Sequence, residues 1–290
     1  DAEVYQGEFL GLYRTRFHRD HDPLISIIIP NKDHVDDLKR CMDSIDQKST
    51  YKNYEYIIVD GGSKDSTLDI VKKYEPLFKG RMKWKSEPDR GIYDAMNKGI
   101  MRSSGIIIGI VNSDDWLEPE ALAYVYRKFE DNGKREDVIY AGDMYFHHRN
   151  GKKSVLKASL KKLAQYAKIG DIAGIRHPAT FVPMKLYDKY GMFDIRMKIS
   201  ADADFLLRIF RAAGVDGYVL INQCVTNMSD CGTSNTLSLD FISNKMLPDR
   251  KYLMGNMNFS SLKQIFCISI WYIKMIVKVL LSNIGAFHVR

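Results

Sequence analysis

Short apolar runs alternate with amphipathic stretches through the first part of this 290-residue chain. Runs this short and this rich in isoleucine and valine are typical of buried strands in a parallel sheet. The stretches between them repeat their apolar residues at the spacing of one helical face. The expected strands are Leu24–Ile29 (ended by Pro30), Tyr56–Val59, Met82–Lys85 and Ile106–Val111, and the expected helices are Val35–Ile45, Ser66–Tyr74, Gly91–Met101 and one that begins at Pro119.

The pattern is looser after Gly142, where the expected elements are the strands Val138–His147, Ser154–Leu156 and Ala179–Val182 and the helix Asp202–Ala213. Strand–helix–strand repetition predicts right-handed crossovers. We therefore expect an α/β, Rossmann-like fold with a mostly parallel central sheet covered by helices on both faces. In such sheets ligands bind beyond the carboxyl ends of the strands.

The C-terminal segment Leu262–Leu281 is apolar almost all round, and Lys263, Lys274 and Lys278 form one narrow stripe on it. Lysines at the bilayer centre cost roughly 2.5–3.5 kcal/mol each, which argues against a membrane-spanning helix. A helix that lies in the surface of an anionic membrane fits better, with its lysines at the headgroups. The alternative is a buried packing helix or the interface of a homodimer.

The composition is that of an ordinary globular protein, with 45% hydrophobic and 27% charged residues. The four cysteines form no C-x-x-C pair, which argues against a zinc site. A net charge of +7 suits an anionic membrane or a phosphorylated ligand. Nucleic acid is not expected as a partner, since the chain has no zinc-finger, helix-turn-helix or RNP-type pattern. No apolar leader is visible in residues 1–22, which predicts a cytoplasmic protein.

Two adjacent carboxylates, Asp114 and Asp115, follow the most apolar expected strand directly. A divalent metal that bridges two phosphates needs hard oxygen ligands on a rigid strand end. The alternative role, capping the next helix, is weak because that helix is expected to begin at Pro119. The pair therefore predicts a metal site beside a diphosphate.

Two further acidic loops follow expected strands. Asp60 precedes Gly61 and Gly62, where the backbone can approach a ligand closely and a carboxylate can accept from a base N–H or a ribose hydroxyl. Asp89 and Arg90 precede a helix N-terminus. Asp89 suits a contact with a nucleobase or ribose, and Arg90 suits a contact with a diphosphate. The alternatives are a plain turn at the first loop and a helix cap at Asp89.

Four ordered motifs carry a resemblance to a known family: Ser26-Ile27-Ile28-Ile29-Pro30, Ile58-Val59-Asp60-Gly61-Gly62-Ser63, Glu87-Pro88-Asp89-x-Gly91-x-Tyr93-x-Ala95-x-Asn97-x-Gly99 and Asn112-Ser113-Asp114-Asp115. At this spacing the chain resembles the family 2 glycosyltransferases of the glycosyltransferase A fold. The resemblance continues more faintly through His177-Pro178, Gly191-x-Phe193-Asp194 and Ala201-Asp202-Ala203-Asp204.

The resemblance implies a role for each matching position. Pro30, Asp60 and Asp89 would line the nucleoside pocket of a sugar-nucleotide donor, most simply a UDP-sugar. Asp115, helped by Asp114, would bind Mn²⁺ or Mg²⁺ at the diphosphate. Asp202 would be the general base that deprotonates an acceptor hydroxyl, which gives inversion at the anomeric carbon.

Two late features leave alternatives open. Asp202 and Asp204 both lie at the start of one expected helix. Asp202 is the preferred general base and is alternatively the N-cap of that helix, whereas Asp204 is expected on the solvent side. His177 is a candidate third metal ligand or acceptor contact, and equally a structural histidine.

The resulting hypothesis is a metal-dependent inverting glycosyltransferase that acts on a saccharide hydroxyl, on a lipid-linked or surface-polysaccharide acceptor at the inner face of the cell membrane. The alternatives are a non-catalytic nucleotide-sugar or glycan-binding subunit and a sugar-nucleotide pyrophosphorylase. The expected organisation is an N-terminal extension (residues 1–22), a catalytic domain (23–235) and a helical tail (236–290). Within the catalytic domain, residues 23–122 would bind the donor and 123–235 the acceptor.

Overall fold

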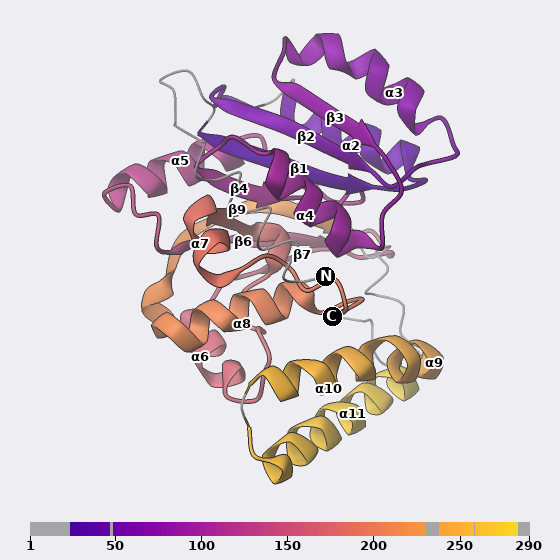
Figure 1. Cartoon of the computed structure of the whole chain (residues 1–290), viewed down its shortest axis with the longest axis vertical. Coiled ribbons are helices and arrows are strands. Elements are labelled where there is room, and N and C mark those ends of the chain that lie inside the picture. Colours follow the sequence, from indigo (N-terminus) through magenta and orange to yellow (C-terminus); the bar gives the residue numbers. More distant parts are fainter. Residues whose placement is uncertain (1–23, 47–48, 230–237, 258, 284–290) are drawn as a thin grey trace.

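The computed structural model describes residues 24–46, 49–229, 238–257 and 259–283, and the described strands form one nine-stranded mixed sheet (Figure 1). Its strand order is β3-β2-β1-β4-β8-β6-β9-β5, with β7 paired to β6. Helices cover both faces of this sheet. The expected N-terminal extension, residues 1–22, lies outside the described residues.

The first four strands are parallel, as predicted, and pair in the order β3-β2-β1-β4. Their elements are β1 (Ile25–Asn31), α2 (Val35–Asp46), β2 (Tyr54–Asp60), α3 (Thr67–Tyr74), β3 (Met82–Ser86), α4 (Ile92–Arg102) and β4 (Ile107–Ile110). The prediction that the first strand ends before Pro30 is wrong, because β1 continues to Asn31. Pro30 pairs with Val59 inside β1, and β4 pairs only as far as Ile28, so no ladder bond from Pro30 to β4 is needed.

The second half of the sheet is mixed, because β8 runs antiparallel to both β4 and β6. Its elements are β5 (Trp116–Leu117), α5 (Ala121–Asp131), β6 (Ile139–His147), β7 (Lys153–Leu156), α6 (Leu160–Ala167), β8 (Thr180–Pro183), α7 (Met184–Tyr190), α8 (Ala201–Ala213) and β9 (Tyr218–Ser229). Helix α5 begins two residues after the expected Pro119, because a turn from Glu118 to Ala121 precedes it.

The alternation of side chains along the strands divides the core between the two faces. Ile25, Ile27 and Ile29 of β1 pack with α2, α3 and α5, whereas Ile28 packs on the opposite face with α4 and α8. Because all of β1 is buried on both sides, its carboxyl end is held rigidly. Every residue of β2 and β4 is buried as well, so the loops that follow these three strands start from fixed points.

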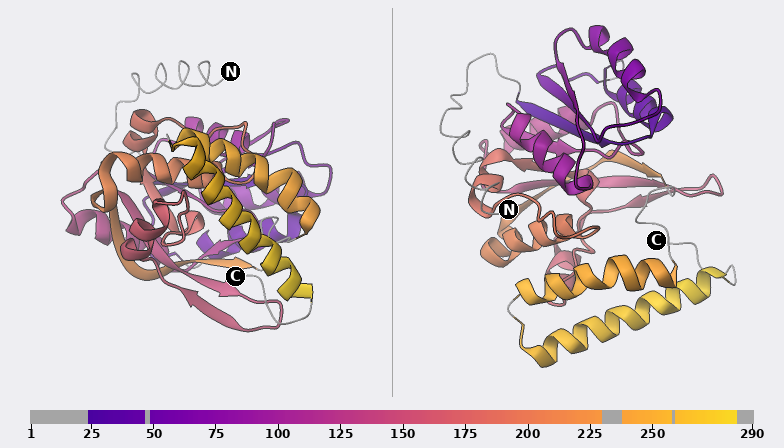
Figure 2. Two further views of the ribbon diagram at one scale, coloured as in Figure 1. Left: turned by 90° about the horizontal axis from the view of Figure 1, so that it is seen from below. Right: turned by 45° about the vertical axis from the view of Figure 1, so that its right-hand side comes forward.

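The C-terminal segment forms a short α9 (Leu239–Phe241), a π-helical turn (Ile242–Met246), α10 (Leu247–Asn256) and α11 (Ser261–Asn283). Helix α10 lies against the body of the protein, and α11 lies outside α10 (Figure 2). On α11, Cys267, Met275 and Val279 are buried. The outward face exposes Leu262, Ile265, Phe266, Ile270, Ile273, Val277 and Leu280. Among the described helices, none combines the length and apolarity needed to cross a membrane.

Candidate active site

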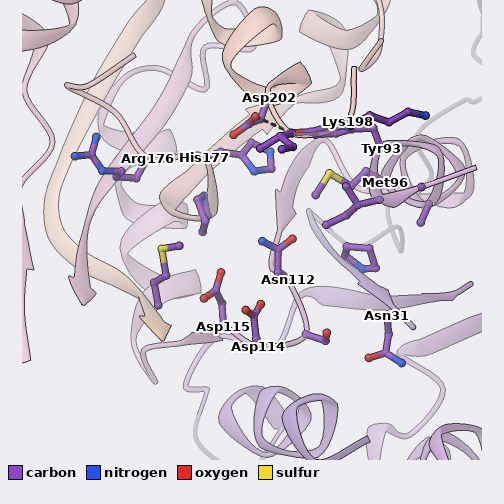
Figure 3. Close-up of a pocket in the computed structure, with 18 of the residues that line it drawn as sticks. Asn31, Tyr93, Met96, Asn112, Asp114, Asp115, Arg176, His177, Lys198 and Asp202 are labelled. Atoms are coloured by element: carbon purple, nitrogen blue, oxygen red, sulfur yellow. Dashed lines mark hydrogen bonds between the residues drawn. The ribbon is translucent and has the colours of Figure 1, made fainter. Parts of the chain in front are cut away.

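A cavity of about 710 Å³ lies beyond the carboxyl ends of β1 and β4 (Figure 3). Its lining contains most of the predicted site residues, namely Pro30, Asp89, Asp114, Asp115, His177 and Asp202. These residues come from segments up to 172 positions apart in the chain (30 to 202), so the fold assembles them. Asp202 of helix α8 lies across the cavity from Asp114 and Asp115 (Figure 3).

Asp114 and Asp115 lie on a tight turn after β4, closed by a hydrogen bond from the Asp115 amide to the Asn112 carbonyl at 3.0 Å. Arg40 of α2 holds this turn, since its guanidinium donates to the Asp114 carbonyl at 2.9 Å and lies 4.7 Å from the Trp116 ring centroid. Neither aspartate is a helix cap. The turn instead directs both carboxylates into the cavity (Figure 3).

The Asp115 carboxylate is 1% exposed, and neither of its oxygens has a partner of hydrogen-bonding geometry among the described residues. Burial, followed by the charge of Asp114, raises the pKa of Asp115 well above its ordinary value, although the nearby Ser229 backbone and the charge of Arg40 act to lower it. Burial also raises the pKa of Asp114. A buried carboxylate without a partner is costly unless a cation binds it, so this end of the cavity suits a divalent metal.

Asn112 adds a third oxygen, since its Oδ1 is also buried without a partner in the described structure. Carboxylate and amide oxygens are the ligands that Mg²⁺ and Mn²⁺ prefer. In the described part of the chain, no three His, Cys, Asp or Glu side chains gather closely enough to hold a metal by themselves. A metal at Asp115 would therefore depend on ligand and water oxygens for the rest of its coordination.

Asp202 lies in the first turn of α8 and lines the cavity. The residue at the helix N-cap is Ser200, so the alternative of Asp202 as the cap is wrong. The hydroxyl of Tyr93 donates a hydrogen bond of 2.9 Å to Asp202 Oδ1. Burial and the charge of Asp202 raise the pKa of Tyr93 well above its ordinary value, so the phenol remains a donor.

The expectation that Asp204 faces solvent is wrong. Asp204 is 5% exposed and forms an ion pair with Arg208 at 2.9 Å. The guanidinium of Arg208 also donates to the carbonyls of Tyr190 and Met192. Asp204 therefore anchors α8 to the preceding loop, and Asp202 is the carboxylate that α8 presents to the cavity.

His177 begins a 3-10 turn (His177–Ala179), and its buried ring packs edge-to-face on Phe193 with 5.5 Å between centroids. Burial lowers the pKa of His177, with the charge of Asp202 acting against this change. Figure 3 places His177 near Asp202 and across the cavity from Asp114 and Asp115. This position suits an acceptor contact better than a metal ligand.

Asp89 also lines the cavity, and its Oδ1 accepts from the Gly91 amide at 2.9 Å. Gly91, at φ 124°, is the N-cap of α4, so Asp89 precedes the cap. Gly61 makes room for this carboxylate, because a Cβ at Gly61 would lie 2.2 Å from Asp89 Oδ2. A residue with a side chain at position 61 would therefore clash with Asp89.

The carboxylates of Asp60 and Asp94 are engaged inside the protein. Asp60 is 1% exposed, and its Oδ2 accepts from the amides of Gly62 and Ser63 and from the Ser86 hydroxyl. Arg90 is paired with Asp94 at 3.5 Å. Neither Asp60 nor Arg90 is among the residues that line the cavity, and their roles at a donor stay predictions.

Residues 26–191 match the model of the family described as Glycosyl transferase family 2. The chain belongs to this family. A glycosyltransferase of Mycobacterium bovis, described as acting in PGL/p-HBAD biosynthesis, is 32% identical over 193 residues, which is 65% of this chain and 70% of that protein. Membership makes the chain a glycosyltransferase, so the non-catalytic subunit and the pyrophosphorylase are set aside.

Two solved structures share the fold of this glycosyltransferase. TarS of S. aureus (residues 1–349) in complex with UDP-GlcNAc has a TM-score of 0.62 at 16% identity, covering 87% of this chain and 72% of that one. The mannosyltransferase PcManGT of Pyrobaculum calidifontis, in complex with GDP-Man and Mn²⁺, has a TM-score of 0.56 at 12% identity, and the match covers 99% of this chain and 83% of that one. The predicted glycosyltransferase A-type fold is thereby confirmed.

Several residues that line or support the cavity of this glycosyltransferase were not predicted from its sequence. Arg40 sits in an ordinary amphipathic helix, and only its contacts with Asp114 and Trp116 reveal its role. Tyr93 lies inside a quoted motif, but its bond to Asp202 spans 109 positions and no local pattern indicates it. Arg176 and Lys198 also line the cavity.

Proposed function

We propose that this glycosyltransferase is a metal-dependent inverting enzyme that moves a sugar from a nucleoside diphosphate donor, a UDP-sugar, to a saccharide hydroxyl. The observation that carries the proposal is one cavity with two acidic ends. Asp114 and Asp115 form the end beside β4, and Asp202 forms the end beside α8. The division suits a diphosphate at one end and an acceptor at the other.

At the first end, Asp115 would hold Mn²⁺ or Mg²⁺, with Asp114 and Asn112 beside it. A bound divalent metal would neutralise the charge that grows on the leaving diphosphate. The buried, unpartnered oxygens of Asp115 support this assignment. Pro30 and Asp89 line the adjoining part of the cavity and would face the nucleoside. Asp60 accepts from the Gly62 and Ser63 amides and would hold the loop whose Gly61 lies against Asp89.

At the second end, Asp202 would act as the general base. The acceptor oxygen forms a bond to the anomeric carbon as the bond from that carbon to the diphosphate oxygen breaks. The diphosphate leaves with the electron pair, and the acceptor proton passes to Asp202. Tyr93 fixes Oδ1 of this carboxylate, which leaves Oδ2 for the proton. A single displacement of this kind inverts the anomeric configuration.

The acceptor in this proposal is a saccharide on a lipid carrier or surface polysaccharide, met at the inner face of the cell membrane. The outward apolar face of α11 supports this. Lys263 and Lys274 are exposed on the same helix and would meet anionic headgroups. An apolar face bordered by lysines suits an anionic bilayer surface better than a second copy of this chain, since two copies would bring like charges together.

The experiment is a screen of UDP-, GDP- and dTDP-sugars with Mn²⁺, first for thermal stabilisation and then for transfer. The product's anomeric configuration is read by NMR. Stabilisation by one donor class and a product inverted relative to the donor would support the proposal. A product with retained configuration, or the same turnover after the metal is chelated, would refute it.

A further inference from the structure

Helix α10 lies outside the residues that match the family model, which end at 191, yet it contacts two loops that line the cavity. One loop contributes Lys198 and Ile199 to the lining and leads into α8. The other contributes the consecutive residues 171–173. Two neighbouring residues of α10, one acidic and one basic, form hydrogen bonds to these loops.

Asp249 is the acidic residue, and it is 3% exposed. Its Oδ2 accepts from the backbone amides of Lys198 at 2.9 Å, Ile199 at 2.6 Å and Ser200 at 3.0 Å, and Oδ1 lies 3.0 Å from the Lys198 amide. Three consecutive N–H groups thus point at one buried carboxylate. This convergence fixes the turn immediately before α8, the helix whose first turn carries Asp202.

Arg250 is the basic residue. Its guanidinium donates to the carbonyls of Ile169, at 2.6 Å, and Gly170. Gly170 has φ +72°, and a Cβ there would lie 1.9 Å from Met254 Cε on the same helix. The loop before residues 171–173 is therefore fitted closely to α10.

We propose that Asp249 is a positioning residue for sugar transfer. It holds the 198–200 turn and, through it, the placement of Asp202 relative to the acceptor hydroxyl. The inference rests on the proposed function, because it takes Asp202 as the base. It also gives the C-terminal segment a role in the active site besides any membrane contact.

The test compares Asp249→Asn with Tyr252→Phe, measured with the intact chain. Asp249→Asn keeps the size of the side chain, loses the charge and turns an NH₂ group toward amide donors. Tyr252→Phe is the matched control on the same helix, since it removes a 3.0 Å hydrogen bond to Asp194, which does not line the cavity. Asp249→Glu, which keeps the charge, serves as a second variant.

In Asp249→Asn we expect kcat to fall roughly ten- to a hundredfold, in line with the effect of a small misplacement of a reacting group. The affinity for the sugar nucleotide, measured by calorimetry, should stay within about twofold, because the donor end of the cavity is not touched. Hydrogen exchange of the 198–200 amides should become faster. Tyr252→Phe should keep the wild-type kcat, and the kcat of Asp249→Glu should lie between those of wild type and Asp249→Asn.

An Asp249→Asn variant with wild-type kcat would overturn the positioning role, and so would a Tyr252→Phe variant with the same loss of kcat. An equal loss of donor affinity and kcat would also overturn it, as that marks a general loosening of the fold. Absence of transfer in the wild-type chain with every donor is a distinct result. It would refute the proposed function and the positioning role together.

Discussion

Replacement of Asp115 by asparagine tests the proposed metal site through stability and needs no knowledge of the acceptor. Asparagine has nearly the same volume and cannot ionise. In wild type, burial first and then the charge of Asp114 raise the pKa of Asp115 above its ordinary value of 3.8. The protonated form is therefore favoured by folding. Its stabilising effect is complete below that ordinary value and is lost as the pH rises through the raised pKa of the folded state.

Two consequences follow for the metal-free protein. The melting temperature of wild type should fall as the pH rises through the raised pKa, because the carboxylate must then ionise in a buried position beside the charge of Asp114. Asp115→Asn should remove this contribution to the pH dependence and melt at a higher temperature than wild type on the alkaline side. The measurement is a series of thermal melts in EDTA over a range of pH.

Added Mn²⁺ should reverse the order of the two proteins. A ligand at a hundred times its Kd stabilises the native state by about 2.7 kcal/mol. At roughly 2–4 °C per kcal/mol for a chain near this size, the wild-type melt should rise by roughly 5–10 °C. Asp115→Asn should lose most of that rise. A variant that keeps the full Mn²⁺ response, or a wild-type melt in EDTA that rises through the same pH range, would refute the reasoning.

Three further predictions concern other parts of the structure. Tyr93→Phe removes the hydrogen bond to Asp202 and should lower kcat roughly tenfold without changing the affinity for the sugar nucleotide. Tyr74→Phe loses a similar hydrogen bond to Asp43 and should keep its kcat, so equal kinetics in the two variants would contradict this prediction. Gly170→Ala should lower stability by about 1–3 kcal/mol in denaturant melts, and clearly more than Gly80→Ala, whose φ is +81° but whose added Cβ meets nothing within 4 Å. Phe266→Ser combined with Ile273→Ser should release the protein from anionic vesicles in sedimentation, whereas Leu239→Ser, at an exposed site off α11, should leave binding intact. Unchanged sedimentation of the double variant would rule out the membrane role of α11, and a shift from dimer to monomer would assign that face to a second copy.

The first half of this fold, from β1 to β4, was predictable from sequence because its signals are local. Strands β1, β2 and β4 are largely apolar, buried runs, and each is followed by a loop with glycines or carboxylates, whereas β3 alternates buried and less buried residues. Gly61 shows why such a pattern can be read, since the close approach of Asp89 excludes any side chain there. The order of the strands then places these loops at one edge of the sheet.

The second half of the fold, from β5 to β9, was harder to predict because tertiary contacts determine it. Strand β9 has no regular alternation of buried and exposed residues, since its register with β6 shifts near Asp143 and Asn222 adopts φ 60°. Asp202 and Asp204 are equivalent in local sequence, and only Arg208 and Tyr93 distinguish the buried anchor from the cavity carboxylate. The contacts of Asp249 span about fifty positions and leave no pattern in the chain.

The central claim is that Asp202 removes the proton from the acceptor hydroxyl. Asp202→Asn keeps the side-chain size and can still accept from Tyr93, so the donor end of the cavity should be unchanged. The direct measurement pairs calorimetric binding of the sugar nucleotide with transfer to acceptor, in wild type and in this variant. We predict donor affinity within about twofold of wild type and transfer lower by roughly 10²–10⁴-fold. Transfer at the wild-type rate in Asp202→Asn would contradict the account.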